Sequence, residues 1–230
     1  MHIAVMQKLT LLDFPSRIAC TVFLTGCNLR CPFCHNASLV LPRADAPAGM
    51  EVSQLLEFLQ KRRGRLQGVC VTGGEPTLYP DLPDLLRQIR LLGYEVKLDT
   101  NGTHPDMLRA ILREGLVDYV AMDIKNSPAR YAETCGGVEV LDKVRRSAAL
   151  LMQSGIDYEF RTTLAHPLHT CEDLAAIGQW LQGAKRLFLQ QFVDSGDLIG
   201  SGLTPLTPEE MEQMRQTVLP YIKETTLRGI

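Results

Sequence analysis

The chain has 230 residues, of which 45% are hydrophobic and 22% charged, and its 24 basic and 26 acidic residues leave a formal net charge of −2. This composition is typical of a globular protein and excludes disordered, collagen-like and coiled-coil chains. The near-neutral charge gives no electrostatic reason to expect nucleic acid or an anionic membrane as a partner, and no apolar run approaches the roughly 20 residues that span a bilayer. We expect a single domain over residues 1–230 and, because the first residues lack the pattern of a signal peptide, a cytoplasmic location.

Short apolar runs alternate with helical patterns along the chain, which predicts strands that are each followed by a helix. The predicted strands cover residues 18–24, 69–72, 94–99, 117–124, 157–164 and 186–192, with a short final strand over 224–228. The predicted helices cover residues 53–63, 81–92, 105–114, 141–154 and 170–182, with a further helix beginning at 207. Ser53 is expected to cap the first helix, and Thr170 with Asp173 forms a capping-box pattern. Residues 36–50, which contain two prolines, are predicted to be a loop.

Strand and helix alternate six times, which predicts a parallel sheet with helices on the outside. Eight such units would close a full barrel, so about six indicate an open, partial β/α barrel. An open doubly wound sheet is the alternative. In either α/β fold, ligands bind at the edge formed by the C-terminal ends of the strands. Residues that follow those ends are therefore candidates for one shared site.

Cysteine is the most informative residue type in this sequence. There are seven cysteines, an odd number, and no export signal, so a disulfide framework is not expected. Cys27, Cys31 and Cys34 follow the first predicted strand with C-x3-C-x2-C spacing, and Pro32 prevents a continuous helix there. A loop can wrap three soft thiolates around zinc, Cu(I) or an iron–sulfur cluster, and a cubane cluster with three cysteines leaves one iron without a protein ligand. Zinc with His35 as fourth ligand is the alternative, although structural zinc ligands are usually separated by spacers.

Four further groups of polar or glycine residues lie at predicted strand ends. They are Gly73-Gly74-Glu75-Pro76, Asp99-Thr100-Asn101-Gly102, the pair Asp123 and Lys125, and Arg161. Each also has an ordinary structural explanation, as a glycine turn, an Asn-Gly turn or an ion pair between strand ends. An unpaired carboxylate of Asp99 at the end of an apolar strand would be costly, which favours a ligand or a cation beside it. An arginine inside an apolar strand likewise needs a partner.

The cysteine cluster, with the aromatic Phe33 before its last cysteine, resembles the signature of the radical S-adenosylmethionine (radical SAM) superfamily. His35-Asn36, the Gly-Gly-Glu-Pro stretch and the Asp-Thr-Asn-Gly stretch narrow this resemblance to the glycyl-radical-enzyme activases, such as pyruvate formate-lyase activating enzymes. Leu12-Asp13-Phe14-Pro15 and the length are most similar to the longer activating proteins of anaerobic ribonucleoside-triphosphate reductases. The resemblance extends from about residue 12 to residue 192.

The resemblance implies that Cys27, Cys31 and Cys34 hold a [4Fe–4S] cluster whose fourth iron binds SAM. One electron, expected from a flavodoxin or ferredoxin, would cleave SAM to methionine and a 5′-deoxyadenosyl radical. That radical would take a hydrogen from a glycine of a partner glycyl radical enzyme, the anaerobic ribonucleotide reductase being the expected one. A radical SAM enzyme that acts on a small molecule, such as a deazapurine precursor, is the alternative. A zinc-stabilised binding module is a third hypothesis.

The resemblance also implies contacts to the cofactor. Phe33 is implied to lie beside the cluster, and Gly73, Gly74 and Glu75 at the methionyl amine of SAM. Asp99 and Asn101 are implied to lie near the ribose and methionine. Asp123 and Lys125 are implied to contact SAM, and Arg161 to bind its carboxylate. A monovalent cation between Asp99 and Asp123 is compatible with the same pattern. The sequence departs from related activases near the sixth strand, where they carry a histidine. We expect Gln191 or Phe192 to take its place.

Overall fold

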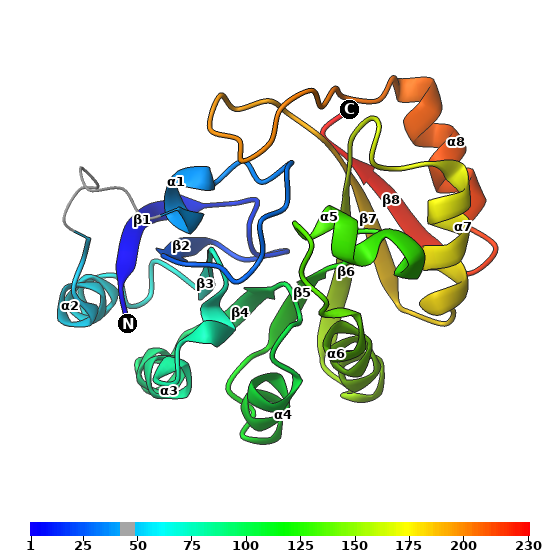
Figure 1. Cartoon of the computed structure of the whole chain (residues 1–230). Helices are drawn as coiled ribbons and strands as arrows, with labels where there is room; N and C mark the ends of the chain where they lie inside the picture. The colour runs from blue at the N-terminus through cyan, green and yellow to red at the C-terminus, as the bar shows by residue number, and fades with distance from the viewer. Residues whose placement is uncertain (42–48) are drawn as a thin grey trace.

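The computed structural model describes residues 1–41 and 49–230 and contains one sheet of eight strands. The strands lie side by side in the order of the sequence, from β1 to β8. β1 is antiparallel to β2, and every later neighbouring pair is parallel. β1 and β8 are the two edge strands of this sheet, and within the described residues they do not pair with each other (Figure 1). The predicted open, partial β/α barrel is therefore confirmed.

The strands match the predicted ones closely, with one addition. They are β1 Ile3–Thr10, β2 Ala19–Leu24, β3 Gly68–Gly73, β4 Glu95–Thr100, β5 Tyr119–Asp123, β6 Asp157–Leu164, β7 Arg186–Gln191 and β8 Glu224–Arg228. β1 was not predicted because it is antiparallel to β2 and no helix separates the two strands, so it lies outside the strand–helix alternation on which the prediction was based. Six strand–helix connections join β2 to β8, as the alternation predicts.

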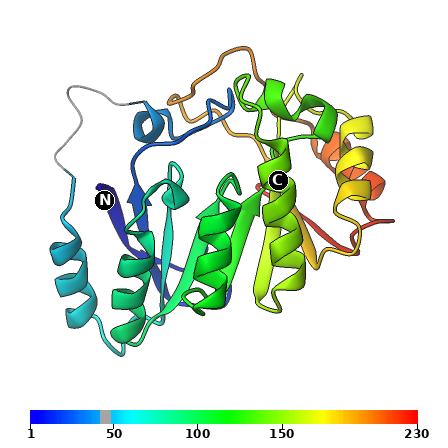
Figure 2. The same ribbon diagram turned by 60° about the horizontal axis from the view of Figure 1, so that its bottom comes forward.

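The helices connect successive strands. They are α1 Ala37–Val40, α2 Val52–Lys61, α3 Leu82–Leu91, α4 Pro105–Arg113, α5 Tyr131–Thr134, α6 Leu141–Gln153, α7 Cys171–Trp180 and α8 Pro208–Val218, with short 3-10 helices η1 Pro76–Leu78 and η2 Pro128–Arg130. The longer ones, from α2 to α8, cover the outer face of the sheet, whereas the short helices α1 and α5 lie beyond the strand ends (Figure 2). In the described ranges, none of them is long and apolar enough to cross a membrane.

Two local predictions need correction. The loop predicted over residues 36–50 contains the short helix α1, and residues 42–48 of it lie outside the described residues. Ser53 does not cap α2, because Glu51 precedes the helix and forms a capping box with Gln54. The capping box predicted from Thr170 and Asp173 is confirmed at the start of α7.

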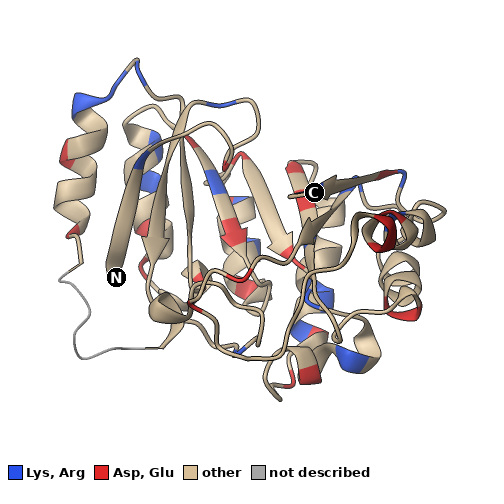
Figure 3. Ribbon diagram, turned by 90° about the horizontal axis from the view of Figure 1, so that it is seen from above, with Lys and Arg blue, Asp and Glu red and all other residues tan. Residues whose placement is uncertain are grey.

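The two faces of the sheet differ in chemistry. In β4, Val96 and Leu98 belong to the apolar core, whereas Lys97 and Asp99 alternate with them and face the interior of the barrel. The same alternation in β5 and β6 places Asp123 and Arg161 on the interior face. Figure 3 shows the resulting blue and red bands on strands in the middle of the molecule as well as on the helices around them. The apolar core therefore lies between sheet and helices, and the barrel interior is left for polar groups.

Candidate active site

A cavity of about 270 Å³ lies at the C-terminal ends of the strands, inside the barrel. The predicted site residues that line it are Cys27, Cys31, Phe33, Cys34, Gly73, Gly74, Asp99, Asn101, Asp123, Lys125 and Arg161. They come from the loop after β2 and from the ends of β3, β4, β5 and β6. The tertiary structure thus brings every predicted site residue except Glu75 to one cavity.

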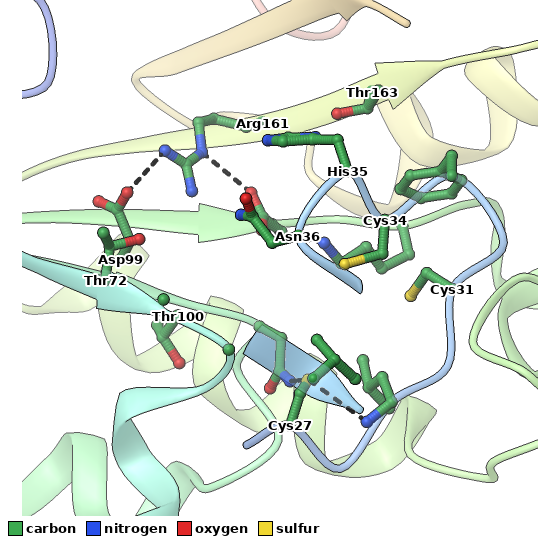
Figure 4. A pocket seen from close by; sticks show the side chains of 18 of the residues that line it. Cys27, Cys31, Cys34, His35, Asn36, Thr72, Asp99, Thr100, Arg161 and Thr163 are labelled. Atoms are coloured by element: carbon green, nitrogen blue, oxygen red, sulfur yellow. Dashed lines mark hydrogen bonds and ion pairs between the residues drawn. The ribbon is translucent and has the colours of Figure 1, made fainter. Parts of the chain in front are cut away.

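The loop after β2 carries the three cysteines, whose side chains surround one part of the cavity (Figure 4). It turns tightly, since the backbone N–H of Cys34 donates to the carbonyl of Cys31 at 3.0 Å. The backbone N–H of Leu29 donates to the Cys27 sulfur at 3.4 Å, and that of Asn36 donates to the Cys34 sulfur. Burial raises the pKa of the Cys27 thiol to about 11. The free thiols therefore need a metal, or another source of positive charge, to become thiolates.

The cysteine geometry distinguishes between the candidate metal groups. A zinc ion draws four ligand atoms to about 2.0–2.3 Å. Among residues 1–41 and 49–230, however, no three Cys, His, Asp or Glu side chains are close enough together to hold one ion. Three separated thiols around a common space instead suit a larger group, such as an iron–sulfur cluster. The residues present therefore fit a cluster better than the zinc alternative with His35.

A fourth cysteine, Cys135, lies next to this loop. It is fully buried and is not among the residues that line the cavity, and its thiol raises the pKa of the neighbouring Cys31 thiol. Its carbonyl accepts the backbone N–H of Arg30 at 3.2 Å, which holds it against the cysteine loop. Within the described residues, only three cysteines face the cavity, so a cubane cluster there would keep one iron free for another ligand.

Five charged side chains form a continuous row of ion pairs along the cavity wall. Arg161 lies at its centre, donating from Nη1 to Asp99 at 3.0 Å and from Nε to Asp123 at 2.9 Å (Figure 4). Lys97 pairs with Asp99, and Lys125 pairs with Asp123 at 2.9 Å. Three cations face two carboxylates in the row, and Asp13 adds a third carboxylate to the cavity lining, so these charges balance. Lys125 and Arg161 are the two cations of the row that line the cavity, and they can attract an anionic group there.

The ion pairs determine the protonation of these groups. Burial alone would raise the pKa of Asp123, but the charges of Arg161 and Lys125 outweigh it and hold that pKa well below its usual range. Arg161 and Lys97 likewise lower the pKa of Asp99 against its burial. The expectation that Asp99 needs a charged neighbour is thus met by protein side chains. Lys97 was not predicted as a site residue, although it lies two residues before Asp99 in the same strand, which places both side chains on one face.

Glu75 is the predicted site residue that the structure places elsewhere. Its carboxylate is fully buried and accepts hydrogen bonds from the hydroxyl of Thr100 at 2.8 Å, the backbone N–H of Asn101 at 2.6 Å, and both the backbone N–H and the hydroxyl of Thr77. Four donors from the protein bind it, and they hold the end of β4 in place. A contact between Glu75 and a ligand ammonium group stays a prediction.

The glycines before Glu75 also have a structural explanation. A Cβ on Gly74 would lie 1.9 Å from the carbonyl oxygen of Gly26, and a Cβ on Gly73, whose φ is +126°, would lie 2.2 Å from that of Leu24. The backbone N–H of Gly74 donates to the carbonyl of Leu24 at 2.8 Å. These glycines therefore let β3 approach the start of the cysteine loop, in addition to lining the cavity.

The expected replacement for the missing histidine near β7 is wrong. Gln191 points away from the cavity, where its amide exchanges hydrogen bonds with the backbone of Leu206. Phe192 is buried in the core, and Gln190 is the residue of this stretch that lines the cavity. Alternation along β7 explains the position of Gln191, because adjacent residues face opposite sides of a sheet, whereas Phe192 lies beyond the end of the strand.

Several other residues line the cavity that were not predicted as site residues. They are Asp13, Thr21, Phe23, Asn36, Thr72 and Thr163. The Thr21 hydroxyl donates to Asp13 at 2.5 Å, so Asp13 belongs to the part of the cavity wall near β1 and β2. Asp13 lies within the stretch Leu12-Asp13-Phe14-Pro15, which resembles activating proteins but was not predicted to be part of the site.

The model of the radical SAM superfamily matches residues 21–181, more than half of the chain and the part that carries this cavity. The chain therefore belongs to the radical SAM superfamily. Membership implies a [4Fe–4S] cluster and SAM, and the geometry of the three cysteines fits the cluster. The protein is a radical SAM enzyme.

Individual relatives are similar over different lengths. A protein of Methanocaldococcus jannaschii, whose name assigns it provisionally to the glycyl-radical enzyme activating enzymes, is 29% identical over 96% of this chain and 93% of its own length. A 7-carboxy-7-deazaguanine synthase of Methanopyrus kandleri is 34% identical over 45% of this chain and 48% of its own length. A domain of a pyruvate-formate lyase-activating enzyme from Bacteroides vulgatus has the same fold, with a TM-score of 0.57, 20% identity, and coverage of 71% of this chain and 99% of that one.

Proposed function

We propose that this protein is a glycyl-radical-enzyme activase with an anaerobic ribonucleotide reductase as its target. One observation carries the choice within the superfamily. The relative from Methanocaldococcus jannaschii that matches nearly end to end is named as such an activating enzyme, whereas the deazaguanine synthase matches under half of either chain. A single domain over residues 1–230 and a cytoplasmic location belong to the same proposal.

The cysteines would hold the cluster, and it would supply the electron that cleaves SAM to methionine and a 5′-deoxyadenosyl radical. That radical would take the hydrogen from Cα of a glycine in the partner, giving 5′-deoxyadenosine and a glycyl radical. A flavodoxin or ferredoxin would provide the electron.

The row of ion pairs would bind and orient SAM. Lys125 and Arg161 line the cavity and favour the SAM carboxylate, and the guanidinium of Arg161 is suited to two carboxylate oxygens. Arg161 is held from both sides by Asp99 and Asp123, so its position is set before a ligand enters. A monovalent cation between Asp99 and Asp123 would compete with Arg161 for the same oxygens.

The first test measures 5′-deoxyadenosine by mass spectrometry after anaerobic reconstitution with iron and sulfide and addition of SAM and dithionite. We expect product from the wild-type protein and none from Cys34→Ala. Cys171→Ala is the matched control, because Cys171 lies at the start of α7 and does not line the cavity. No product from protein that carries a full cluster would refute the proposal.

A second test separates the activase from the small-molecule alternative. Anaerobic ribonucleoside-triphosphate reductase is added with SAM and reductant, and the glycyl radical is detected by electron paramagnetic resonance. We expect one 5′-deoxyadenosine for each glycyl radical formed. Product that accumulates only with a deazapurine precursor, with no glycyl radical, would instead favour the alternative that the deazaguanine synthase similarity suggests.

A further inference from the structure

The side-chain amide of Asn101 has only one orientation that satisfies its neighbours. Its Oδ1 accepts the backbone N–H of Thr103 at 3.0 Å and the Thr103 hydroxyl at 2.7 Å. A backbone N–H can only donate, so Oδ1 must face Thr103 and Nδ2 must face the opposite way. On that side, Nδ2 donates to Oδ1 of Asn28 at 3.0 Å and to the sulfur of Cys27 at 3.8 Å. Asn101 is thus an obligatory donor toward one of the three cavity-lining thiols.

This donor comes from outside the cysteine loop. The other donor to Cys27, the backbone N–H of Leu29, is part of the loop itself. A thiolate bound to iron can only accept hydrogen bonds, so the contact from Asn101 would become charge-assisted when a cluster is held. Hydrogen bonds to cluster sulfurs are among the factors that set the reduction potential of an iron–sulfur cluster.

The buried carboxylate of Glu75 fixes the position of Asn101. Oε2 of Glu75 accepts the backbone N–H of Asn101 at 2.6 Å, and Oε1 accepts the hydroxyl of the preceding Thr100. Asn28 completes the network by donating to the hydroxyl of Thr103 at 3.0 Å. Side chains from β4, the turn after β3 and the cysteine loop are therefore held in one hydrogen-bonded unit.

We propose that Asn101 is a positioning residue that raises the reduction potential of the cluster by donating a hydrogen bond to the sulfur of Cys27, and that Glu75 holds it there. This role adds to the contact with SAM expected at Asn101. The inference rests on the cluster of the proposed function but not on the glycyl radical partner.

The experiment is a redox titration of the reconstituted protein, followed by electron paramagnetic resonance and carried out without SAM. Asn101→Asp keeps an acceptor for Thr103 and replaces the donor by an oxygen that faces Cys27. Asn101→Ala removes the donor without adding charge. We expect the midpoint potential of the cluster to fall in both variants, and to fall further in Asn101→Asp.

Asn28→Asp is the matched control. It adds the same charge next to Cys27 and keeps the acceptor for Nδ2 of Asn101, while no hydrogen bond joins Asn28 to the sulfur. Its potential should fall less than that of Asn101→Asp. An unchanged potential in Asn101→Ala, or equal shifts in the two aspartate variants, would overturn the inference.

The rate at which a chelator removes iron gives a second measurement, which does not depend on the midpoint potential. Removal of cluster iron by a chelator should be faster in Glu75→Gln than in wild type, because an amide lacks the charge that orients the donors of Thr100 and Asn101. Wild-type protein that takes up no [4Fe–4S] cluster would contradict the proposed function itself. A normal cluster whose potential and chelation rate do not respond to these substitutions would contradict only the role of Asn101.

Discussion

Arg161 is the residue on which the cavity wall depends most. Its guanidinium is the only group that joins the two halves of the ion-pair row within the described residues, since Lys97 reaches Asp99 and Lys125 reaches Asp123. The interior position of these carboxylates makes an unpaired charge expensive, so their partners contribute to stability as well as to ligand binding.

Arg161→Gln should therefore lower the free energy of unfolding by about 3 kcal/mol at neutral pH, measured by urea denaturation. Because the native pKa values of Asp99 and Asp123 are depressed, their pairing stabilises the fold above the ordinary aspartate pKa of about 3.9 and is lost as pH falls through the lower native values. The difference from wild type should thus narrow below about pH 4. Arg87→Gln is the control, because Arg87 pairs with Glu114 at the surface and should matter far less. A difference that is constant with pH would contradict the assignment.

At the scale of elements, the close approach of β3 to the cysteine loop positions the thiols. The loop begins where β2 ends, and Gly74 and Glu75 donate backbone hydrogen bonds to the carbonyls of Leu24 and Gly26, each at 2.8 Å. No side chain can stand between these two backbones. The Gly-Gly pair therefore acts on the site largely through the distance between two elements.

Gly74→Ala should displace the loop and reduce the iron and sulfide taken up on reconstitution, since its Cβ would lie 1.9 Å from the carbonyl oxygen of Gly26. Gly115→Ala is the control. Its Cβ meets nothing within 4 Å, so the positive φ of +63° costs only about 1–2 kcal/mol and leaves the loop in place. Equal cluster content in the two variants would show that the close approach is not required.

Helix α7 offers a test of local stability away from the cavity. Thr170 accepts the backbone N–H of Asp173, whose carboxylate also accepts the Ser127 hydroxyl at 2.6 Å and pairs with Arg130. Thr170→Ala should cost about 1 kcal/mol of unfolding free energy, whereas Asp173→Ala should cost more because it removes all of these contacts. Thermal unfolding of both variants measures the difference, and a larger loss in Thr170→Ala would argue against this ranking.

On the scale of the whole molecule, β8 has one strand neighbour, β7, within the part of the chain that the structure describes. Arg228 of β8 compensates by reaching across the interior to Glu159 of β6, with two contacts of 2.9 and 3.0 Å. Its guanidinium also lies 3.3 Å from the ring centre of Phe188 in β7, and Glu159 is further held by the hydroxyl of Tyr119 at 2.8 Å. The end of the sheet is therefore held by side chains where strand pairing stops.

Arg228→Met should destabilise the protein by about 2–3 kcal/mol, less than the loss of a fully enclosed pair because Arg228 is partly exposed. The loss arises because Glu159 stays buried without a cation. Adding Glu159→Gln to Arg228→Met should then restore part of the stability, as measured by urea denaturation in a double-mutant cycle. If the two losses simply add, the residues do not act as a pair.

Much of this protein could be predicted from the sequence by itself, because its signals are local. The alternation of apolar runs and helical patterns predicted six strand–helix units and the open barrel, and the strand ends predicted which residues share a site. The spacing of Cys27, Cys31 and Cys34 predicted a site for zinc, Cu(I) or an iron–sulfur cluster. The resemblance of these cysteines and Phe33 to the radical SAM signature then favoured the cluster.

Only the tertiary structure decided which of those residues face the cavity and which support them from behind. Glu75 is turned inward by donors that come from Thr100 and Asn101, far from it in sequence, and Lys97 gains its role only because Arg161 lies on a strand two places away. Strand β1 was not predicted because it precedes β2 without an intervening helix and so lies outside the strand–helix alternation. Such features depend on contacts between distant parts of the chain, which local propensity and spacing do not encode.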